Sequence, residues 1–576
     1  MRPIVGGDDD TKKHGSNKSA GNACSDAILF ILLVPMILSR LNQIGFWVRT
    51  HRALSIALLL AISLSLMGAN WGRVECWNLD NMAFRGVMPN FLPCGGYLKP
   101  PLHIYLNQTL VMKPAEALRS VLGFEHNWQY PLQLWGARLV TLALFCGTIV
   151  LIYHVARRNC GPRSAGVLAL ITATTAGLIM FNHFATADSP LLFWMMASFA
   201  LALKAARTGR TLDAFYAGLV AGLATADKYN GLGVAIAIPA AIVTLQGWKF
   251  LFGKQCWVGA FAVPLGFILG NPGAVFDSKN FVEDFLYNLY TTPVYDGKTA
   301  GAGYFDFLTR IPDLIGWPGV VLISIGMMIS LYLLFRGRLS RNELALLAAT
   351  GAVFLFYYVT IGRFPRMADR FVLPVIPFLF LFAAPGFERL CWKQIIPAVT
   401  LGVILIYNIF CSVEVGQRFL SDPRMDAQLF ALKYFWKGAV IENSNAPDWG
   451  RLPGLTVKAP HLPSAGSRAS RFTRLFGQNS VIQQGIEKFE TSEYPADTFT
   501  LEGLKQRNPD FVAFSNQAFQ FTDDEQALGF YHALDDGKMG YVKVFDQSWK
   551  PRAPWSYPHD IDFLAERMII LKRAEN

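Results

Sequence analysis

Residues 71–106 read WGRVECWNLDNMAFRGVMPNFLPCGGYLKPPLHIYL. This polar, proline-broken stretch lies between two strongly apolar runs, Ala53–Gly68 and Gly136–Ala156. A polar segment between two such runs predicts a loop on one side of a membrane. It carries Asp80 and the Lys99-Pro100-Pro101 block, which are the first candidates for a functional role.

The composition of the whole chain supports a membrane protein. Of its 576 residues, 52% are hydrophobic and only 16% are charged, which is too apolar for a soluble protein of this length. The net charge of +11 is assigned first to cytoplasmic loops, where Lys and Arg set the orientation of the spans. We therefore expect no nucleic-acid partner.

Apolar segments recur along the chain and predict about eleven transmembrane helices. Several are shorter than the roughly twenty residues that a span requires, so they must extend into flanking residues. The segments are Ala53–Gly68, Gly136–Ala156, Ala165–Phe181, Pro190–Ala205, Ala214–Ala226, Gly231–Leu245, Trp257–Leu269, Leu314–Phe335, Leu344–Ile361, Phe371–Phe387 and Ile395–Val413.

The basic residues predict the orientation. If the N-terminus is cytoplasmic, the loops that follow the second, fourth, sixth, eighth and tenth spans are also cytoplasmic. All five of these loops carry Lys or Arg, as the positive-inside rule requires. These residues are Arg157, Arg158, Arg163, Lys204, Arg207, Arg210, Lys249, Lys254, Arg336, Arg338, Arg341, Arg389 and Lys393. We expect a multi-pass protein of the cell (inner) membrane.

Three regions follow from this topology. Residues 1–52 would form a cytoplasmic tail with an interfacial helix, and residues 53–413 a transmembrane domain whose first outer loop is 71–135. Residues 414–576 would form an extracytoplasmic mixed α/β domain. Within it, Met425–Trp436 is typical of a helix, and residues 508–516, 540–549 and 563–573 are typical of strands.

One outer loop departs from the orientation rule. Arg363, Arg366 and Arg370 lie within nine residues on the side where basic residues should be few. Such a cluster can bind an anionic partner such as a phosphate. It can also bind lipid head groups, and the sequence leaves both open.

Two other outer turns carry polar residues that could act in chemistry. His183 and Asp188 lie between the third and fourth spans, and Asp188 precedes Ser189-Pro190, so it could simply cap a helix. It could instead orient a basic group or bind a metal. Lys228 and Tyr229 follow the fifth span, where a Lys can also merely reach to the membrane surface.

The first outer loop offers a candidate base. Asp80 could be a turn residue, or it could accept a proton from an attacking hydroxyl. Lys99 and His103 start a segment, HIYLNQTLVM, with the pattern of an amphipathic helix on the membrane.

Taken in order, these motifs resemble the GT-C class of membrane glycosyltransferases. The similarity is greatest to protein O-mannosyltransferases and lipid A aminoarabinose transferases. It covers about residues 71–377. The matching motifs are Asp80, Lys99-Pro100-Pro101-Leu102, Ala137-Arg138-Leu139, Thr186-Ala187-Asp188-Ser189-Pro190-Leu191, Lys228-Tyr229-Asn230-Gly231 and Arg370-Phe371-Val372-Leu373-Pro374-Val375-Ile376-Pro377.

The resemblance implies a polyprenyl-phosphate-sugar donor and inverting transfer on the outer membrane face. Asp80 would be the base and Asp188 would orient basic groups or bind a divalent metal. The substrate-binding residues would be Lys99, His103, His183, Lys228, Tyr229, Arg363, Arg366 and Arg370. The acceptor could be a lipid, a glycan or a protein. Family members often have Asp-Glu in the first loop, whereas Asn81 follows Asp80 here, so Glu75 is a second candidate base.

Two other classes stay open. A transporter or flippase of a lipid-linked precursor is compatible with many spans, although transporters usually place ionisable residues near the bilayer midplane. The second class is a non-catalytic membrane scaffold. A scaffold needs no catalytic base, so it should tolerate Asp80→Asn.

Two cysteines share the first outer loop. If that loop lies in an oxidising compartment, Cys76 and Cys94 can form a disulfide that flanks Asp80. Two free thiols are the alternative, because no spacing rule requires the bond.

Overall fold

The computed structural model describes residues 50–71, 97, 99–122, 129–291, 303–364, 367–390, 394–436, 439–443, 499–516, 519, 525–550 and 567–574. Asp80, Arg366, Glu75 and the predicted Cys76–Cys94 disulfide lie outside these residues. The chain divides into two compact units, residues 1–55 and 56–576. All the elements described here belong to the second unit, except that α2 begins in the first.

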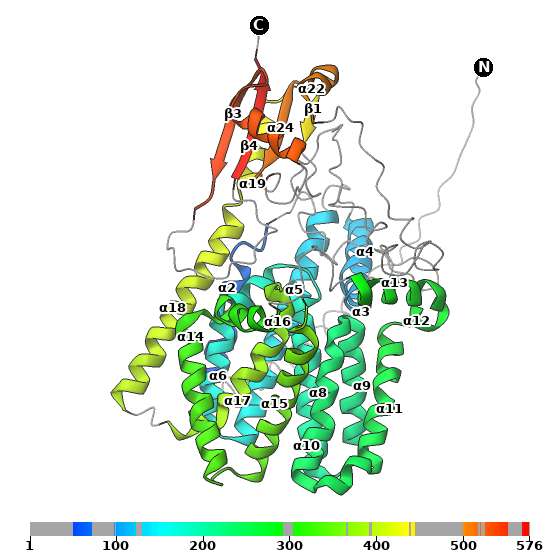
Figure 1. Ribbon diagram of the computed structural model, residues 1–576, viewed down its shortest axis with the longest axis vertical. Helices are drawn as coiled ribbons and strands as arrows, with labels where there is room; N and C mark the ends of the chain where they lie inside the picture. Colours follow the sequence, from blue (N-terminus) through cyan, green and yellow to red (C-terminus); the bar gives the residue numbers. More distant parts are fainter. Residues whose placement is uncertain are drawn as a thin grey trace, which may run out of the picture. The chain divides into compact units, whose positions relative to one another are not determined.

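The second unit is mainly helical, and Figure 1 shows its helices packed side by side. The helices up to α13 are α2 (Arg52–Leu66), α3 (Leu102–Asn107), η3 (Gln108–Met112), α4 (Lys113–Leu122), α5 (Gln129–Asn159), α6 (Pro162–Thr174), α7 (Ala176–His183), α8 (Asp188–Thr208), α9 (Thr211–Asp227), η5 (Tyr229–Ile236), α10 (Ala237–Gln246), η6 (Trp248–Phe252), α11 (Lys254–Gly270), α12 (Gly273–Phe276) and α13 (Ser278–Thr291). The next are α14 (Gly303–Phe335), α15 (Arg341–Ile361), α16 (Asp369–Val372), η8 (Leu373–Val375), α17 (Ile376–Arg389) and α18 (Ile395–Leu420).

The predicted apolar segments are all helical, but eleven spans are not confirmed. Among the described residues, seven helices are long and apolar enough to cross a membrane, or eight if the bent pair α6–α7 is one span. The helices α2, α9 and α11 have 15, 17 and 17 residues, which is short of the roughly twenty that a straight span requires. Together these helices make the chain an integral multi-pass membrane protein.

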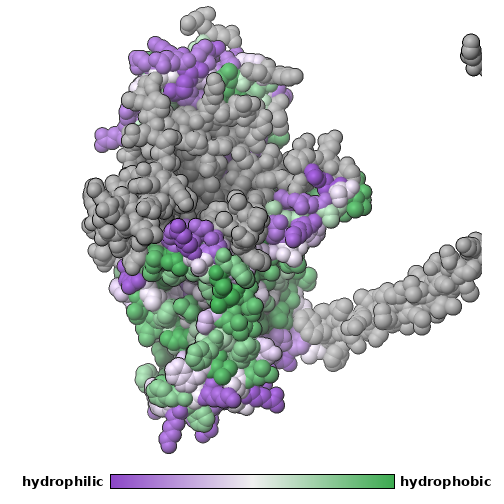
Figure 2. All heavy atoms as spheres, turned by 90° about the vertical axis from the view of Figure 1, so that its right-hand side faces the viewer, coloured by the Kyte–Doolittle hydropathy of each residue, from purple (hydrophilic) through white to green (hydrophobic). Residues whose placement is uncertain are grey.

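The outer surface of the helices agrees with a lipid environment. Figure 2 shows one face on which hydrophobic side chains cover the middle of the helical region and hydrophilic ones gather at its ends. On α11, the exposed side chains Trp257, Phe261, Leu265 and Leu269 recur at helical spacing. An exposed apolar surface of this extent is typical of a helix that contacts lipid.

Glycines bring α9 and α11 into close contact. A Cβ atom at Gly218 would lie 2.0 Å from the carbonyl oxygen of Gly259, and one at Gly222 would lie 2.1 Å from that of Val263. Only glycine permits this approach, which is the usual way membrane helices pack without a hydrophobic driving force. The contact holds the end of α9, where Asp227 and Lys228 lie.

The C-terminal part contains the predicted small sheet. Its strands run in the order β1 (Ile441–Asn443), β2 (Phe511–Ser515), β4 (Arg567–Arg573) and β3 (Tyr541–Ser548). β1 pairs parallel to β2, whereas β4 pairs antiparallel to both β2 and β3. The helices α19 (Pro423–Tyr434), α22 (Leu501–Arg507) and α24 (Glu525–Asp535) accompany it.

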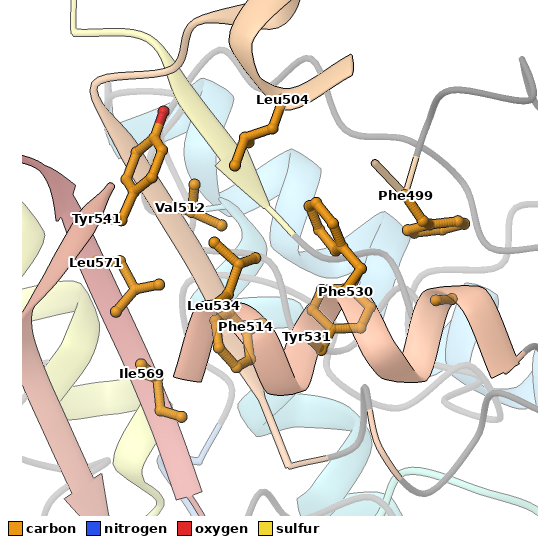
Figure 3. Close-up of a cluster of buried hydrophobic side chains, with 11 residues drawn as sticks. Phe499, Leu504, Val512, Phe514, Phe530, Tyr531, Leu534, Tyr541, Ile569 and Leu571 are labelled. Atoms are coloured by element: carbon orange, nitrogen blue, oxygen red, sulfur yellow. The ribbon is translucent and has the colours of Figure 1, made fainter. Parts of the chain in front are cut away.

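Alternating side chains give this sheet two apolar faces. Val512, Phe514, Ile569 and Leu571 join residues of α22 and α24 in one buried cluster, which Figure 3 shows. The residues between them, including Phe511, Ala513, Met568 and Ile570, pack with Ala427 and Ala431 of α19 on the other face. A sheet that is covered on both faces requires this continuous apolar pattern.

An ion-pair network joins β4 to β3 and α24, and it predicts a pH-dependent stability. Arg567 donates to Asp546 at 2.8 and 2.5 Å and to Asp535 at 2.8 and 3.1 Å. The pKa of Asp546 is lowered mainly by these bonds. Burial would raise the pKa of Asp535, but the bonds from Arg567 and Lys543 outweigh it, so it too is lowered.

We expect Arg567→Ala to destabilise the sheet by about 1 kcal/mol, a modest value because the three side chains are partly exposed. Both carboxyl pKa values are lowered on folding, so the stabilisation is present above the ordinary Asp pKa of about 3.9 and is lost as pH falls below it. Hydrogen exchange of the β3 and β4 amides should therefore speed up in the variant at pH 7 but much less at pH 3. Lys538→Ala, at an exposed pair with side chains 70% and 57% accessible, is the control and should change nothing.

Candidate functional site

An ion pair joins the start of α8 to the residue after α9. The Lys228 Nζ atom donates to Asp188 Oδ1 at 2.5 Å. The side chains of Lys228 and Asp188 are only 24% and 9% exposed. Because water is largely excluded, this pair interacts more strongly than a surface pair, and losing either partner would leave a poorly solvated charge.

The turn that carries Lys228 is held in shape by its neighbours. The backbone N–H of Gly231 donates to the carbonyl of Lys228 at 2.8 Å, and a Cβ atom at Gly231 would lie 2.4 Å from the carbonyl oxygen of Ala224. The hydroxyl of Tyr357, from α15, donates to the carbonyl of Asn230 at 2.6 Å. The turn therefore needs a glycine, and it presents Lys228 in a fixed position.

Three elements meet next to this ion pair. A Cβ atom at Gly270, the end of α11, would lie 2.5 Å from Ala226 Cβ on α9 and 3.6 Å from Leu102 Cδ1 on α3. The residue that follows each of these three positions is polar: His103, Asp227 and Asn271. All three side chains are fully buried.

These three polar side chains have no hydrogen-bond partner in the described structure. Both ring nitrogens of His103, both carboxylate oxygens of Asp227 and both amide atoms of Asn271 are unpaired. Asn107, one helical turn after His103, is also buried and unpaired at both amide atoms. We call these four residues the polar chamber. Leaving a buried polar group unpaired costs about 1–3 kcal/mol, so the chamber is suited to bind polar groups of a ligand.

The charges of the chamber are coupled to the ion pair. Burial lowers the pKa of His103 to about 4, although the nearby Asp188 carboxylate opposes this effect. His103 is thus neutral at pH 7 and offers one donor and one acceptor nitrogen. Asp227 lies close enough to interact electrostatically with both Asp188 and Lys228.

Two further hydrogen bonds bring the segment that contains Lys99 close to Tyr229, the residue after Lys228. The hydroxyl of Tyr229 donates to the carbonyl of Tyr97 at 2.7 Å, and the backbone N–H of Tyr97 donates to Asp284 Oδ2 at 2.6 Å. Lys99, two residues after Tyr97, is half-buried. The structure thus brings together five predicted site residues: Lys99, His103, Asp188, Lys228 and Tyr229.

His183 has a different environment. Its Nε2 and Nδ1 atoms lie 2.6 and 2.8 Å from the backbone carbonyl oxygens of Met67 and Ile179, and its ring stacks on Phe419 with centroids 4.4 Å apart. Both ring nitrogens are therefore engaged with the backbone. With these contacts the His183 ring secures the turn after α2, and neither of its nitrogens is left to bind a substrate.

The predicted basic cluster is described in part. The guanidinium carbon of Arg363 lies 5.8 Å from the ring centre of Phe364, and that of Arg370 lies 5.7 Å from that of Phe371. The segment is tied to α14, where Arg310 approaches the buried Asp369 at 3.6 Å.

The prediction that Asp188 binds a divalent metal stays a prediction. One Asp188 oxygen accepts from the Lys228 ammonium, and among the described residues no group of three His, Cys, Asp or Glu side chains could hold a metal ion.

The sequence missed Asp227, Asn107 and Asn271 as candidates for the site. A signal for Asp227 was present, because an ionisable residue next to an apolar membrane segment is costly and usually functional. Asn107 lies in a predicted amphipathic segment and Asn271 directly precedes a proline, and an uncharged Asn is ordinary in both places, so neither had such a signal.

Comparisons with known proteins agree on the fold. Residues 132–269, less than half of the chain, match the family model described as dolichyl-phosphate-mannose-protein mannosyltransferase. A search of curated protein sequences gave no match.

Among solved structures, ArnT from Cupriavidus metallidurans bound to undecaprenyl phosphate is similar with a TM-score of 0.52 and 16% identity, over 91% of this chain and 97% of that chain. Its apo structure gives a TM-score of 0.51 and 16% identity over 92% and 98%. AglB from Archaeoglobus fulgidus, in complex with an inhibitory peptide and a dolichol-phosphate, gives 0.45 and 14% over 89% and 75%. The likeness to ArnT confirms the predicted GT-C fold.

Proposed function

We propose that this protein is an inverting glycosyltransferase. It would move a sugar from a polyprenyl-phosphate donor to an acceptor hydroxyl or phosphate on the outer face of the cell (inner) membrane. Support comes from the GT-C fold, from the partial match to a mannosyltransferase family and from ArnT, which was solved with undecaprenyl phosphate bound. The N-terminus would be cytoplasmic and residues 414–576 extracytoplasmic.

The observation that carries this proposal is the Asp188–Lys228 pair beside the polar chamber. Asp188 holds the Lys228 ammonium in place, and that ammonium has further N–H groups that can donate to a lipid phosphate. The unpaired groups of His103, Asn107, Asp227 and Asn271 would donate to and accept from the hydroxyls of the attached sugar. Phosphate and sugar would then bind side by side, as a sugar phosphate requires.

The proposed chemistry is a single displacement. Asp80 takes the proton of the acceptor hydroxyl, the acceptor oxygen bonds to the anomeric carbon, and the bond from that carbon to the phosphate oxygen breaks. The phosphate leaves with the bonding electron pair. Lys228 stabilises this developing charge, and Asp188 keeps the ammonium in position. Arg366, Arg370, Arg363 and Lys99 would assist by attracting the phosphate.

The glycosyltransferase activity is tested by following an isotope-labelled sugar from a defined lipid donor to its acceptor. Membranes that contain the chain are supplied with undecaprenyl phosphate carrying isotope-labelled mannose, glucose or 4-aminoarabinose, and mass spectrometry follows the label into lipids, glycans and proteins. We expect one donor to lose its sugar to an acceptor, and membranes with Lys228→Met to lack this transfer. Donor that crosses the bilayer intact, with no label transferred, would instead support a flippase.

A further inference from the structure

Two arginines meet at the end of the helices that lies opposite the Asp188–Lys228 pair. Arg207 is in the last turn of α8, whose first residue is Asp188, and Arg158 is in the last turn of α5. Asn159, the residue after Arg158, accepts a hydrogen bond on its Oδ1 atom from Arg207 Nη1 at 2.8 Å. This bond fixes the end of α5 against the end of α8.

The neutral side chain of Asn159 leaves the charge of Arg207 uncompensated. The Asn159 amide nitrogen donates to the carbonyl of Val155 at 2.7 Å, so its oxygen is the atom that faces Arg207. An amide oxygen accepts a hydrogen bond from a guanidinium group but carries no negative charge. The Arg207 Nε atom is buried and has no hydrogen-bond partner in the described structure. Arg207 therefore keeps both its charge and an unused donor.

Arg158 adds a second positive charge to this place. It lies close enough to Arg207 for the two guanidinium groups to repel each other. Among the residues that the structure describes, no carboxylate forms an ion pair with either arginine, and Asp213 already binds Lys204 and Thr208, each at 2.7 Å. A positive charge at the C-terminal end of a helix is favourable, which accounts for each arginine singly. It does not account for two arginines from different helices that repel each other.

Exposed apolar side chains lie beside the arginines. The turn after α8 leads into α9, where Leu212 and Tyr216, one helical turn apart, are both exposed. Gln255 of α11 donates to the carbonyl of Gly209 in that turn, and Trp257 of the same helix is exposed as well. This end of the helices thus combines positive charge with apolar side chains, as a charged lipid head group and its acyl chains require.

We propose that Arg158 and Arg207 bind the phosphate of an anionic membrane lipid, in the leaflet opposite to the candidate functional site. A guanidinium group can donate two parallel hydrogen bonds to a phosphate, and a phosphate between two such groups removes their repulsion. Basic pockets between membrane helices bind lipid head groups of this kind. Leu212 and Tyr216 favour a lipid over free phosphate, because they would contact its acyl chains. The inference does not depend on the proposed function and adds a second lipid site.

The decisive variant is Asn159→Asp, which keeps both arginines and the size of the side chain but places a carboxylate against Arg207. That carboxylate should compensate the charge that the lipid phosphate binds, so the affinity for phosphatidylglycerol should fall about tenfold or more. Native mass spectrometry of the full chain in detergent, titrated with phosphatidylglycerol, measures this affinity, and phosphatidylcholine is the reference lipid without net charge. If the arginines only stabilise helix ends, Asn159→Asp should bind phosphatidylglycerol as the wild type does.

Arg158→Gln guards against an Asn159 variant that fails to fold, because Arg158 is exposed. It should weaken phosphatidylglycerol binding by a similar factor. Arg338→Gln is the matched control, since it removes an exposed arginine from the turn between α14 and α15, and it should bind as the wild type does. A fall in the first two variants alone supports the site.

Three results would overturn the proposal. The first is unchanged phosphatidylglycerol binding in either Asn159→Asp or Arg158→Gln. The second is an equal loss in Arg338→Gln, which would show that net charge alone controls lipid binding. The third is displacement of the bound phosphatidylglycerol by inorganic phosphate at equal concentration, which would assign the site to a free phosphate.

Discussion

Replacing Asp80 by Asn should lower sugar transfer by at least about a hundredfold, because Asn cannot accept the proton of the attacking hydroxyl and general-base catalysis contributes that much or more. Binding of undecaprenyl phosphate should not change, since the lipid phosphate needs positive charge and not the base. The measurement is kcat and lipid affinity on the same purified preparation. The basis is the position of Asp80 in the loop before the Lys99-Pro100-Pro101 block.

Glu75→Gln is the matched control for this variant. It removes one carboxylate from the same stretch of sequence, and it should leave kcat within about twofold of wild type if Asp80 is the base. A large loss in Glu75→Gln with an active Asp80→Asn would transfer the role to Glu75. Activity above about a tenth of wild type in both variants would exclude either carboxylate as an essential base.

Replacing Lys228 by Met should also reduce transfer by about a hundredfold to a thousandfold, the usual cost of removing a group that stabilises developing negative charge. Unlike Asp80→Asn, this change should also weaken binding of undecaprenyl phosphate, since the phosphate is charged before and after the reaction. Lys228→Arg keeps the charge but changes its geometry, and should retain part of the binding.

Loss of Lys228 would also leave Asp188 as a poorly solvated charge, so the variant could be less stable for reasons unrelated to catalysis. The double variant Asp188→Asn/Lys228→Met removes both charges and separates the two effects. We expect it to regain the thermal stability lost in Lys228→Met but to stay inactive. If the double variant transfers sugar at the wild-type rate, Lys228 has only a structural role.

Much of the architecture was predictable from the chain because it depends on local patterns. Apolar runs must become helices in a membrane, where no water can satisfy the backbone. Each predicted segment from Ala53–Gly68 to Ile395–Val413 is indeed helical. The number of spans was less predictable, since the 17-residue helices α9 and α11 are packed through glycines and their length alone does not show whether they cross. In the C-terminal part, the short run FVAFS between turn residues and the final run that contains MIIL predicted β2 and β4.

The individual components of the candidate site were also visible in the sequence. Asp188 and Lys228 could be selected because charge beside a membrane segment is costly and is retained for a reason. His183 could be selected for the same reason, yet both its ring nitrogens face backbone carbonyls, and the sequence could not tell a ligand-binding histidine from one that secures a turn.

What the sequence determined by itself is therefore the helical membrane class, the small sheet, and which charged residues are exceptional. The tertiary structure decided which of them meet. His103, Asp227 and Asn271 come near one another only because the start of α3 and the ends of α9 and α11 meet, and Trp71 bonds to Asp422 across 351 residues. Hydropathy and spacing report on neighbours along the chain, whereas these contacts depend on how separate helices pack, which no local pattern encodes.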